Sequence, residues 1–249
     1  MNKILSCKNT KSILYKKPNI KSERLKEMVF GEIFIKLKEH KTFCYGFTQY
    51  DKYYGYIKKN CLSINPKKNN FLVYSAKAYL YKSNNLKSKT KKFLYFNSIV
   101  YILSIRKKLS QSNIGWIKNT DLRSLKNIKK RNFLENIKIF KKTKYLWGGN
   151  TIDGIDCSGL VQELMKNKLI KCPRDSKDQE VFFKRSVMRK KVKKGDLLFW
   201  KGHVAIAVNN KECVHAYGPA KKVVKVKINS LISKLTKKSL NLSSIKRPL

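Results

Sequence analysis

The sequence has no long hydrophobic run, and that absence already limits what the protein can be. None of its apolar stretches approaches the roughly 18–20 residues that a membrane-spanning helix needs, which predicts a soluble globular protein without a membrane span. The basic N-terminal stretch also lacks the continuous apolar segment of a secretory signal, because only Ile4-Leu5 and Ile13-Leu14-Tyr15 are apolar there. We therefore expect a cytoplasmic protein.

The sequence also lacks closely spaced cysteines. No two of its six cysteines form a CxxC or CxxxC pair. This spacing argues against a zinc site and against a disulfide scaffold, so most of them are expected to be small buried apolar side chains. The six are Cys7, Cys44, Cys61, Cys157, Cys172 and Cys213.

Acidic residues are scarce, since 15 Asp and Glu stand against 58 Lys and Arg and the formal net charge is +43. Such a chain attracts anions at low salt, so one interpretation is a nucleic-acid or anionic-envelope partner. The other is a bias of base composition, because Lys, Asn and Ile are abundant together and the lysines spread along the whole chain. Arginine, whose fork reads bases and phosphates, is sparse. We favour the second interpretation and predict no specific nucleic-acid partner.

Short strand-like runs fill the first half of the chain. Between residues 28 and 125 these runs are rich in Tyr, Phe, Ile and Val and are separated by polar turns, which favours small β-barrels or sandwiches. The phrase Gly55-Tyr56-Ile57-Lys58 returns as Gly115-Trp116-Ile117-Lys118, and it resembles the closing strand of bacterial SH3-like domains. The sequence therefore predicts two small SH3-like β-barrels.

The chain divides into four predicted segments. The first residues lack periodicity and are expected to form a mobile basic tail. A boundary near Asn65-Pro66 separates the two barrels, and the helical spacing of Phe133, Ile137 and Phe140 predicts a connecting helix before the last domain. The predicted limits are 1–22 for the tail, 23–66 and 67–125 for the two SH3-like domains, and 126–249 for the last domain.

Cys157 stands where a helix is expected to begin. Turn residues run up to Gly154, and the segment that follows has an apolar face at helical spacing from Leu160 to Met165. If Asp156 is the N-cap, Cys157 lies in the first turn, where the positive end of the helix dipole stabilises a thiolate. This is the position that a nucleophilic cysteine needs.

Two of the three histidines, His203 and His215, lie twelve positions apart on predicted strands, whereas His40 is expected in a solvated loop. Either one alone would suit a structural role. With a helix-capped cysteine they suggest a base and a group that fixes the tautomer of the base. The residue numbers 203 and 215 are both odd, and side chains alternate between the two faces of a hairpin. The two histidines therefore lie on the same face only if the hairpin loop has an odd number of residues or the hairpin contains a bulge. We then expect Ala205 opposite His215.

Three blocks in this region carry a family resemblance. YLWGG…GIDCSGLVQ, CPRDS…Q and KKGDLLFWKGHVAIAV…VHA, in order from Tyr145 to about residue 228, resemble the NlpC/p60 cysteine peptidases. The resemblance implies a papain-like α+β domain. It also implies Cys157 as nucleophile, His203 as base, His215 as the orienting residue, and Tyr145 near the oxyanion site.

Two SH3-like barrels before this domain resemble the subgroup that cleaves γ-D-glutamyl–diamino acid bonds in murein peptides, as dipeptidyl-peptidase VI does. In that subgroup the residues flanking the nucleophile help to hold the free amino end of L-Ala-γ-D-Glu. The resemblance therefore implies a substrate-binding set of Asp156, Ser158, Ser176, Glu32 and Tyr54. The segment from Ala216 to Pro219 does not match the family pattern.

Each of these residues also has a structural interpretation. Asp156 would serve as an N-cap only, Ser158 would be a surface residue, and Glu32 would face solvent among lysines. Trp147 is expected to be a core aromatic. Gly148 and Gly149 are expected to allow a tight backbone before the helix.

The sequence thus predicts a cysteine peptidase that acts in murein peptide recycling and needs no metal or organic cofactor. The expected partner is a murein peptide with a free N-terminal L-Ala. An amidase or acyltransferase on the same core is a second enzymatic interpretation. The two interpretations without catalysis are a murein-binding protein and a nucleic-acid-binding protein, although the intact set of one cysteine and two histidines argues against an idle domain.

Overall fold

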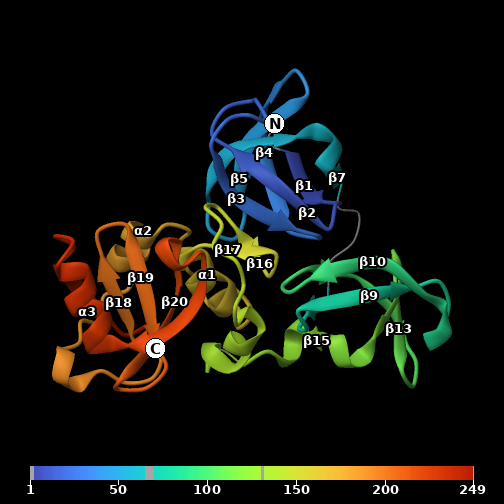
Figure 1. The fold of residues 1–249 in the computed structure, drawn as a ribbon. Coiled ribbons are helices and arrows are strands. Elements are labelled where there is room, and N and C mark those ends of the chain that lie inside the picture. Colours follow the sequence, from blue (N-terminus) through green and yellow to red (C-terminus); the bar gives the residue numbers. More distant parts are fainter. Residues whose placement is uncertain (1–2, 65–69, 130–131, 249) are drawn as a thin grey trace. The chain divides into compact units, whose positions relative to one another are not determined.

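The computed structural model describes residues 3–64, 70–129 and 132–248. They form two compact units, Met1–Lys129 and Lys130–Leu249 (Figure 1). Within the described ranges, no helix combines the length and the hydrophobicity that crossing a bilayer requires.

The first part of the N-terminal unit is an antiparallel sheet of seven strands in the order β3-β2-β6-β5-β4-β1-β7. Side chains alternate between its faces, and the buried face carries Leu14, Met28, Phe34 and Ile57. The strands are β1 (Lys3–Cys7), β2 (Lys11–Tyr15), β3 (Arg24–Val29), β4 (Ile33–His40), β5 (Phe43–Thr48), β6 (Tyr54–Lys58) and β7 (Leu62–Ile64).

The prediction of a mobile tail over residues 1–22 is wrong for the part that the structure describes. Strand β1 pairs with β4 and β7, and β2 pairs with β3. Their apolar side chains Leu5, Cys7 and Leu14 are buried in the core of the sheet. Each strand has only five residues with lysines among them, so its local pattern is weak. Its partners lie later in the chain, where a local pattern cannot identify them.

The rest of the first unit consists of a five-stranded sheet, β10-β9-β14-β13-β12, and a three-stranded sheet, β11-β8-β15. Its core includes Val73, Leu94, Val100 and Ile117. The strands are β8 (Phe71–Val73), β9 (Lys77–Tyr81), β10 (Lys89–Tyr95), β11 (Ile99–Val100), β12 (Ile102–Ile105), β13 (Leu109–Ser112), β14 (Gly115–Lys118) and β15 (Leu122–Ser124).

The internal repeat is visible in the backbone. Strands β6 and β14 each lead into a 3-10 turn and then a short strand, and Lys58 and Lys118 enter these turns with φ −61° and ψ 134° or 135°. Among the described residues, the strand order does not close any of the three sheets on itself. The SH3-like assignment and the domain limits stay predictions, and the boundary at Asn65-Pro66 lies outside the described residues.

The second unit begins with the expected connecting helix, although it is a 3-10 helix (Phe133–Phe140). The helices α1 (Cys157–Lys166), α2 (Ser176–Phe182) and α3 (Ile228–Thr236) follow. A short hairpin, β16 (Asn150–Thr151) and β17 (Gly154–Ile155), precedes α1. The five-stranded sheet has the order β21-β20-β19-β18-β22. Its strands are β18 (Leu197–Trp200), β19 (His203–Ala207), β20 (Glu212–Tyr217), β21 (Lys222–Lys227) and β22 (Leu242–Lys246).

The two sides of this sheet are covered by different helices (Figure 1). Leu231 and Leu235 of α3 pack with Leu198, Ala205 and other side chains of one face. Helix α1, which is buried along its length, contacts β19 and β20 from the other side. The unit therefore mixes helices and sheet as an α+β domain does, and the packing of α1 brings its first residue to the sheet.

Candidate active site

Cys157 is the first residue of α1, as the sequence predicts. Asp156 is the N-cap, with φ −97° and ψ 178°, and its Oδ1 accepts a hydrogen bond of 2.7 Å from the Gly159 amide. The Cys157 side chain is buried, and the backbone of Val204, the residue after His203, hydrogen-bonds the thiol. The helix start and the strand that carries the histidine therefore meet at the sulfur.

The protonation state of the thiol is decided by burial. Burial raises the pKa of Cys157 to about 12, and the Asp156 carboxylate adds to the rise. Backbone hydrogen bonds from Val204 and Ser158, and the Arg174 cation, lower the pKa but do not offset burial. The sequence argument that the helix dipole produces a thiolate is therefore incomplete, because in this structure the sulfur is a neutral thiol at pH 7.

The hairpin of β19 and β20 has the predicted register. Ile206 faces Val214, and Ala207 faces Cys213, so facing numbers add to an even value. Val208 still bonds to Glu212, which leaves a three-residue loop over 209–211. This register puts Ala205 opposite His215 and places the two histidines on one face.

His203 Nε2 and His215 Nδ1 are 2.8 Å apart. Burial lowers the pKa of His203 to about 4. Burial, then the nearby His203 and Lys234, lower the pKa of His215 to about 3. Both rings are therefore neutral at pH 7, and a neutral imidazole is the form that can accept a proton.

The tautomers follow from the role of the base. If His203 Nδ1 is to receive the thiol proton, Nε2 must carry hydrogen and donate it to His215 Nδ1. The hydrogen of His215 then lies on Nε2, which is buried without a hydrogen-bond partner among the described residues. The Tyr217 ring stacks on His215 with centroids 4.9 Å apart, and Trp200 lies 5.9 Å from His203. Packing thus holds both imidazoles.

Arg174 is the residue that the sequence interpretation missed. It is 2% exposed, and it binds Asp156 through two bonds, Nη1–Oδ1 at 2.9 Å and Nη2–Oδ2 at 2.5 Å. Nη1 also donates to Ser158 Oγ at 3.0 Å, and Nε donates to Asn150 Oδ1 at 3.1 Å. A guanidinium fork suits this pairing, so a lone arginine within the CPRDS block was the signal that could have identified it.

The residues predicted to bind an amino group are placed as follows. The Asp156 carboxylate is paired with Arg174, and the Gly148 amide also donates to it at 2.8 Å. Ser158 is buried and bonded to the same guanidinium, so it is not a surface residue. Ser176 is the first residue of α2 and is buried. Because the charge of Asp156 is already paired, its contribution to binding an ammonium stays a prediction.

Glu32 and Tyr54 belong to the first unit. Glu32 is 6% exposed and its Oε2 accepts a 2.7 Å bond from the Val29 amide, so the interpretation in which it faces solvent is wrong. Tyr54 is 51% exposed and packs beside Phe47 on the neighbouring strand. Their participation in the catalytic site stays a prediction.

The loop before α1 contains Tyr145, Trp147 and two glycines. Burial raises the pKa of Tyr145 to about 12, and the nearby Cys157 and Asp156 add to the rise, so its hydroxyl remains a donor. Trp147 is 60% exposed, and the prediction of a core aromatic is wrong. A Cβ on Gly149 would collide with the Gly154 carbonyl oxygen, which explains the glycine there.

Metal ligands do not gather anywhere in the described part of the chain, where no three His, Cys, Asp or Glu side chains form a candidate site. The groups available at this site are the Cys157 thiol, which is bonded to the backbone next to His203, and the neutral imidazole of His203. Such a pair can attack a carbonyl carbon and form an acyl-enzyme.

Comparison with known proteins gives three findings. Residues 142–243 match the model of the NlpC/P60 family. The murein DD-endopeptidase MepS/murein LD-carboxypeptidase of Escherichia coli (strain K12) is 31% identical over 106 residues, which cover 40% of this chain and 52% of that protein. Dipeptidyl-peptidase 6 of Lysinibacillus sphaericus is 34% identical over 87 residues, which cover 35% of this chain and 32% of that protein. The chain thus spans about half or less of these curated relatives.

Solved structures extend the likeness of fold to the whole chain. The crystal structure of an NlpC/P60 family protein from Bacillus cereus ATCC 10987 has a TM-score of 0.84 at 18% identity, over 99% of both chains. An NlpC/P60 endopeptidase from Photobacterium damselae subsp. piscicida has a TM-score of 0.61 at 14% identity, over 97% of this chain and 70% of that one. At such identities the likeness concerns the fold alone.

Proposed function

Residues 142–243 form an NlpC/P60 domain, and from this premise we propose that the protein is a cysteine peptidase that hydrolyses the γ-D-glutamyl–diamino acid bond of murein peptides. One observation carries the proposal. The thiol of Cys157, at the start of α1, hydrogen-bonds the backbone next to His203, whose Nε2 lies 2.8 Å from His215 Nδ1. Nucleophile, base and orienting group are thus supplied by three adjacent elements.

The proposed reaction begins with a neutral pair. As Cys157 Sγ bonds to the carbonyl carbon, its proton passes to His203 Nδ1, and the resulting imidazolium is stabilised by His215 Nδ1. His203 then gives this proton to the leaving amine of the diamino acid as the C–N bond breaks. Water, deprotonated by the same imidazole, hydrolyses the thioester and restores the thiol. Tyr145, protonated beside the thiol, is the candidate donor to the oxyanion.

The proposed substrate has a free N-terminal L-Ala, which fits cytoplasmic recycling of peptides already freed from the glycan. Support for this comes from the family resemblance of Asp156, Ser158 and Ser176, and less directly of Glu32 and Tyr54. Arg174 already pairs with the Asp156 carboxylate, so an ammonium at this carboxylate would share it with the guanidinium.

The test is mass spectrometry of L-Ala-γ-D-Glu-diaminopimelate after incubation with the protein. Release of free diaminopimelate is expected, and Cys157→Ala should abolish it. Because the Cys157 side chain is buried, a thermal melt checks that the variant remains folded. The matched controls Cys172→Ala and Cys213→Ala, at two other buried cysteines, should retain turnover. Turnover by Cys157→Ala above a trace would show that the nucleophile is wrongly assigned.

Amine selectivity is tested by comparing kcat/KM for the same peptide with and without N-acetylation. A site built for the ammonium should lose about 10⁴-fold or more on the acetylated peptide. Equal rates would exclude the amine requirement and point to an enzyme that acts on the wall itself. Cleavage of D,D-linked murein peptides in place of the γ-D-glutamyl bond would refute the proposed bond specificity.

A further inference from the structure

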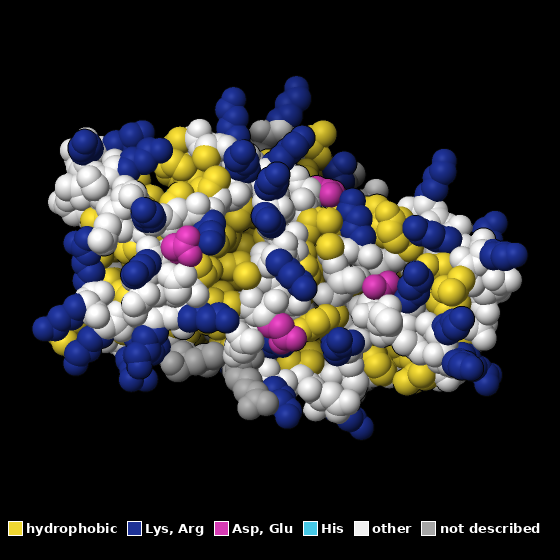
Figure 2. All heavy atoms as spheres, turned by 60° about the horizontal axis from the view of Figure 1, so that its bottom comes forward, with side chains coloured by type: hydrophobic (Ala, Val, Ile, Leu, Met, Phe, Trp, Pro, Cys, Tyr) yellow, Lys and Arg dark blue, Asp and Glu magenta, His cyan; other side chains and the backbone are white. Residues whose placement is uncertain are grey.

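The second unit carries an exposed segment, residues 181–194, with an unusual combination of side chains. Half of its residues are cations, against fewer than one in four in the chain as a whole (58 of 249), and it contains no Asp or Glu. The cations are Lys184, Arg185, Arg189, Lys190, Lys191, Lys193 and Lys194. All seven are exposed, and none forms an ion pair with a described residue. Figure 2 shows that Lys and Arg side chains are also spread over one face of the molecule, where Asp and Glu are few.

Some apolar side chains of the same segment point into the core of the unit, and others point into solvent. Phe183 and Val192 are buried and Val187 packs against the core, so the segment is anchored. Val181, Phe182 and Met188 are instead exposed by 63%, 45% and 55%. These three project into solvent among the cations, and Phe182 also packs edge-on against the buried Phe183.

The backbone of the segment is fixed beside the last strand of the sheet. Val187 N donates to Ile245 O, and Arg247 N donates to Arg185 O. Arg189 Nη2 donates to Asn229 Oδ1 on α3 at 2.9 Å. The exposed apolar and basic side chains are therefore presented on a structured surface.

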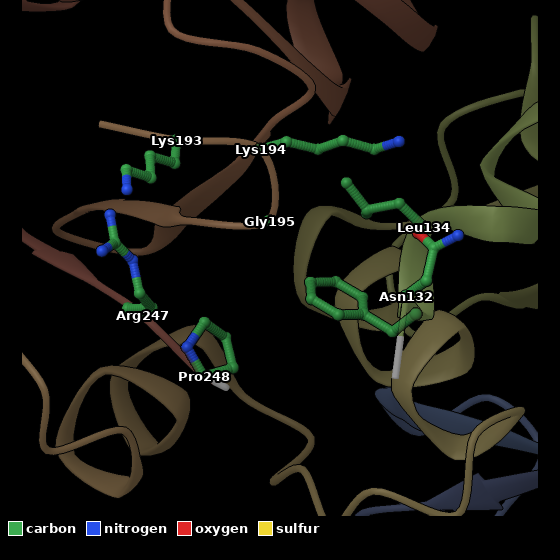
Figure 3. Close-up of a pocket in the computed structure, with 8 residues that line it drawn as sticks. Asn132, Leu134, Lys193, Lys194, Gly195, Arg247 and Pro248 are labelled. Atoms are coloured by element: carbon green, nitrogen blue, oxygen red, sulfur yellow. The ribbon is translucent and has the colours of Figure 1, made fainter. Parts of the chain in front are cut away.

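A pocket of about 420 Å³ adjoins the basic end of the segment (Figure 3). Lys193, Lys194 and Arg247 line it together with Phe133 and Leu134 of the connecting helix. In Figure 3 the side chains of Lys193 and Arg247 point toward one another. Arg247 is bonded to the buried Asp196 at 2.7 and 2.8 Å, so the two lysines supply the uncompensated charge.

We propose that this segment and its pocket form a docking surface for an anionic lipid bilayer. Projecting Val, Phe and Met side chains enter the boundary between headgroups and acyl chains, the cations bind lipid phosphates, and the pocket receives one headgroup. A nucleic-acid strand has the same charge, but two of the three projecting side chains, Val181 and Met188, have no aromatic face on which a base could stack. The combination of aliphatic and cationic groups therefore favours the lipid. This proposal does not depend on the peptidase activity.

The test is co-sedimentation of the full chain with vesicles of phosphatidylcholine, with and without phosphatidylglycerol. Binding is expected only with phosphatidylglycerol, and it should weaken as salt rises. The double variants Phe182→Ser/Met188→Ser and Lys190→Glu/Lys191→Glu should each reduce partitioning by about 10-fold or more. All four positions are exposed, so folding should persist, which a thermal melt checks.

The first unit offers a matched control. Ile105 is 62% exposed and lies next to the exposed pair Lys107 and Lys108. Ile105→Ser and Lys107→Glu/Lys108→Glu should leave vesicle binding unchanged. Three results would overturn the proposal: no binding, equal losses in the control variants, or losses with the charge variant alone. The last two would reduce the effect to general attraction between a polycation and an anion.

Discussion

Two buried ion pairs, one in each unit, make the same kind of electrostatic contact but position different parts of the protein. In the first unit Lys26 Nζ lies 2.7 Å from Asp51 Oδ2, and both side chains are fully buried. In the second unit Arg174 and Asp156 are 1% and 8% exposed. Lys26 joins strand β3 to the turn after β5, whereas Arg174 joins the loop before α2 to Asp156, the N-cap of α1.

The difference lies in what the pair positions. The ammonium of Lys26 is a point charge, and it stabilises a turn whose Asp51 also accepts from the Thr48 hydroxyl. The fork of Arg174 fixes both oxygens of Asp156 and the Ser158 hydroxyl, on either side of Cys157. Both buried pairs hold together segments that are distant in the chain. The Arg174 pair differs because its contacts, Asp156 and Ser158, flank Cys157, the proposed nucleophile.

The largest expected effect comes from removing one cation of each pair. Arg174→Met and Lys26→Met should each lower the free energy of unfolding by about 3–5 kcal/mol, because a buried carboxylate loses its partner. Only Arg174→Met should also lower kcat/KM per folded molecule, on the order of 10²-fold, through misplacement of the thiol. Urea unfolding and assays on the folded fraction measure both quantities. An equal loss of kcat/KM in Lys26→Met would mean that the two pairs do not differ in function.

The next effect concerns the histidine pair, in which His215 is buried and His203 is partly buried. The pKa values of His203 and His215, about 4 and about 3, lie below the ordinary 6.5. The unfolded chain therefore binds protons that the folded chain does not, and stability present above pH 6.5 is lost as pH falls toward 4. For His203 alone the loss is on the order of 3 kcal/mol, at about 1.4 kcal/mol per pKa unit.

Thermal midpoints across this pH range give the measurement. His203→Gln and His215→Gln should flatten the fall of the thermal midpoint with pH. Ile57→Ala, which removes a buried side chain of the first unit without changing a titratable group, should lower the midpoint at every pH and leave the slope unchanged. A slope that both glutamine variants leave intact would contradict the assignment of neutral buried imidazoles.

A smaller effect on stability and kcat/KM is expected when Arg174 is replaced by lysine, which keeps the positive charge but removes the guanidinium fork. Arg174→Lys should cost about 1.5–3 kcal/mol, the range for hydrogen bonds to charged groups, and lower kcat/KM about 10-fold. The matched exchange Lys26→Arg should also cost about 1–3 kcal/mol, through overpacking, but leave kcat/KM unchanged. If Arg174→Lys retains full kcat/KM, charge alone positions the nucleophile.

The smallest effect is expected at the rim of the Arg174 network. Trp147 precedes Gly148, whose amide donates to Asp156, but its own side chain is 60% exposed. Trp147→Ala should change the free energy of unfolding by less than about 0.5 kcal/mol. The buried Trp200 is the control, and Trp200→Ala should cost about 3–5 kcal/mol. A large loss in Trp147→Ala would mean that the loop depends on this ring.

Local signals placed some elements correctly. The N-cap at Asp156 is a contact between residues three apart, so the sequence can show where α1 begins. His203 and His215 both have odd residue numbers. With a three-residue loop, the alternation of side chains along the strands is enough to put both on one face of the sheet. The roles of the site residues in catalysis and binding stay predictions until the variants above are assayed.

Local sequence patterns did not predict the first two strands or the exposure of Trp147. Strands β1 and β2 have weak local patterns and gain stability from partners elsewhere in the sheet. Trp147 looked like a core residue because burial is not encoded in residue type alone.

The sequence by itself determined the start of helix α1, the register of the histidine hairpin and the cationic character of residues 181–194. These depend on side chains a few positions apart, or on composition. Only the tertiary structure decided that Arg174 pairs with Asp156, that Glu32 is buried, and that Cys157 is a neutral thiol. The reason is that desolvation and long-range pairing depend on which segments cover a group, and those segments are distant in the chain.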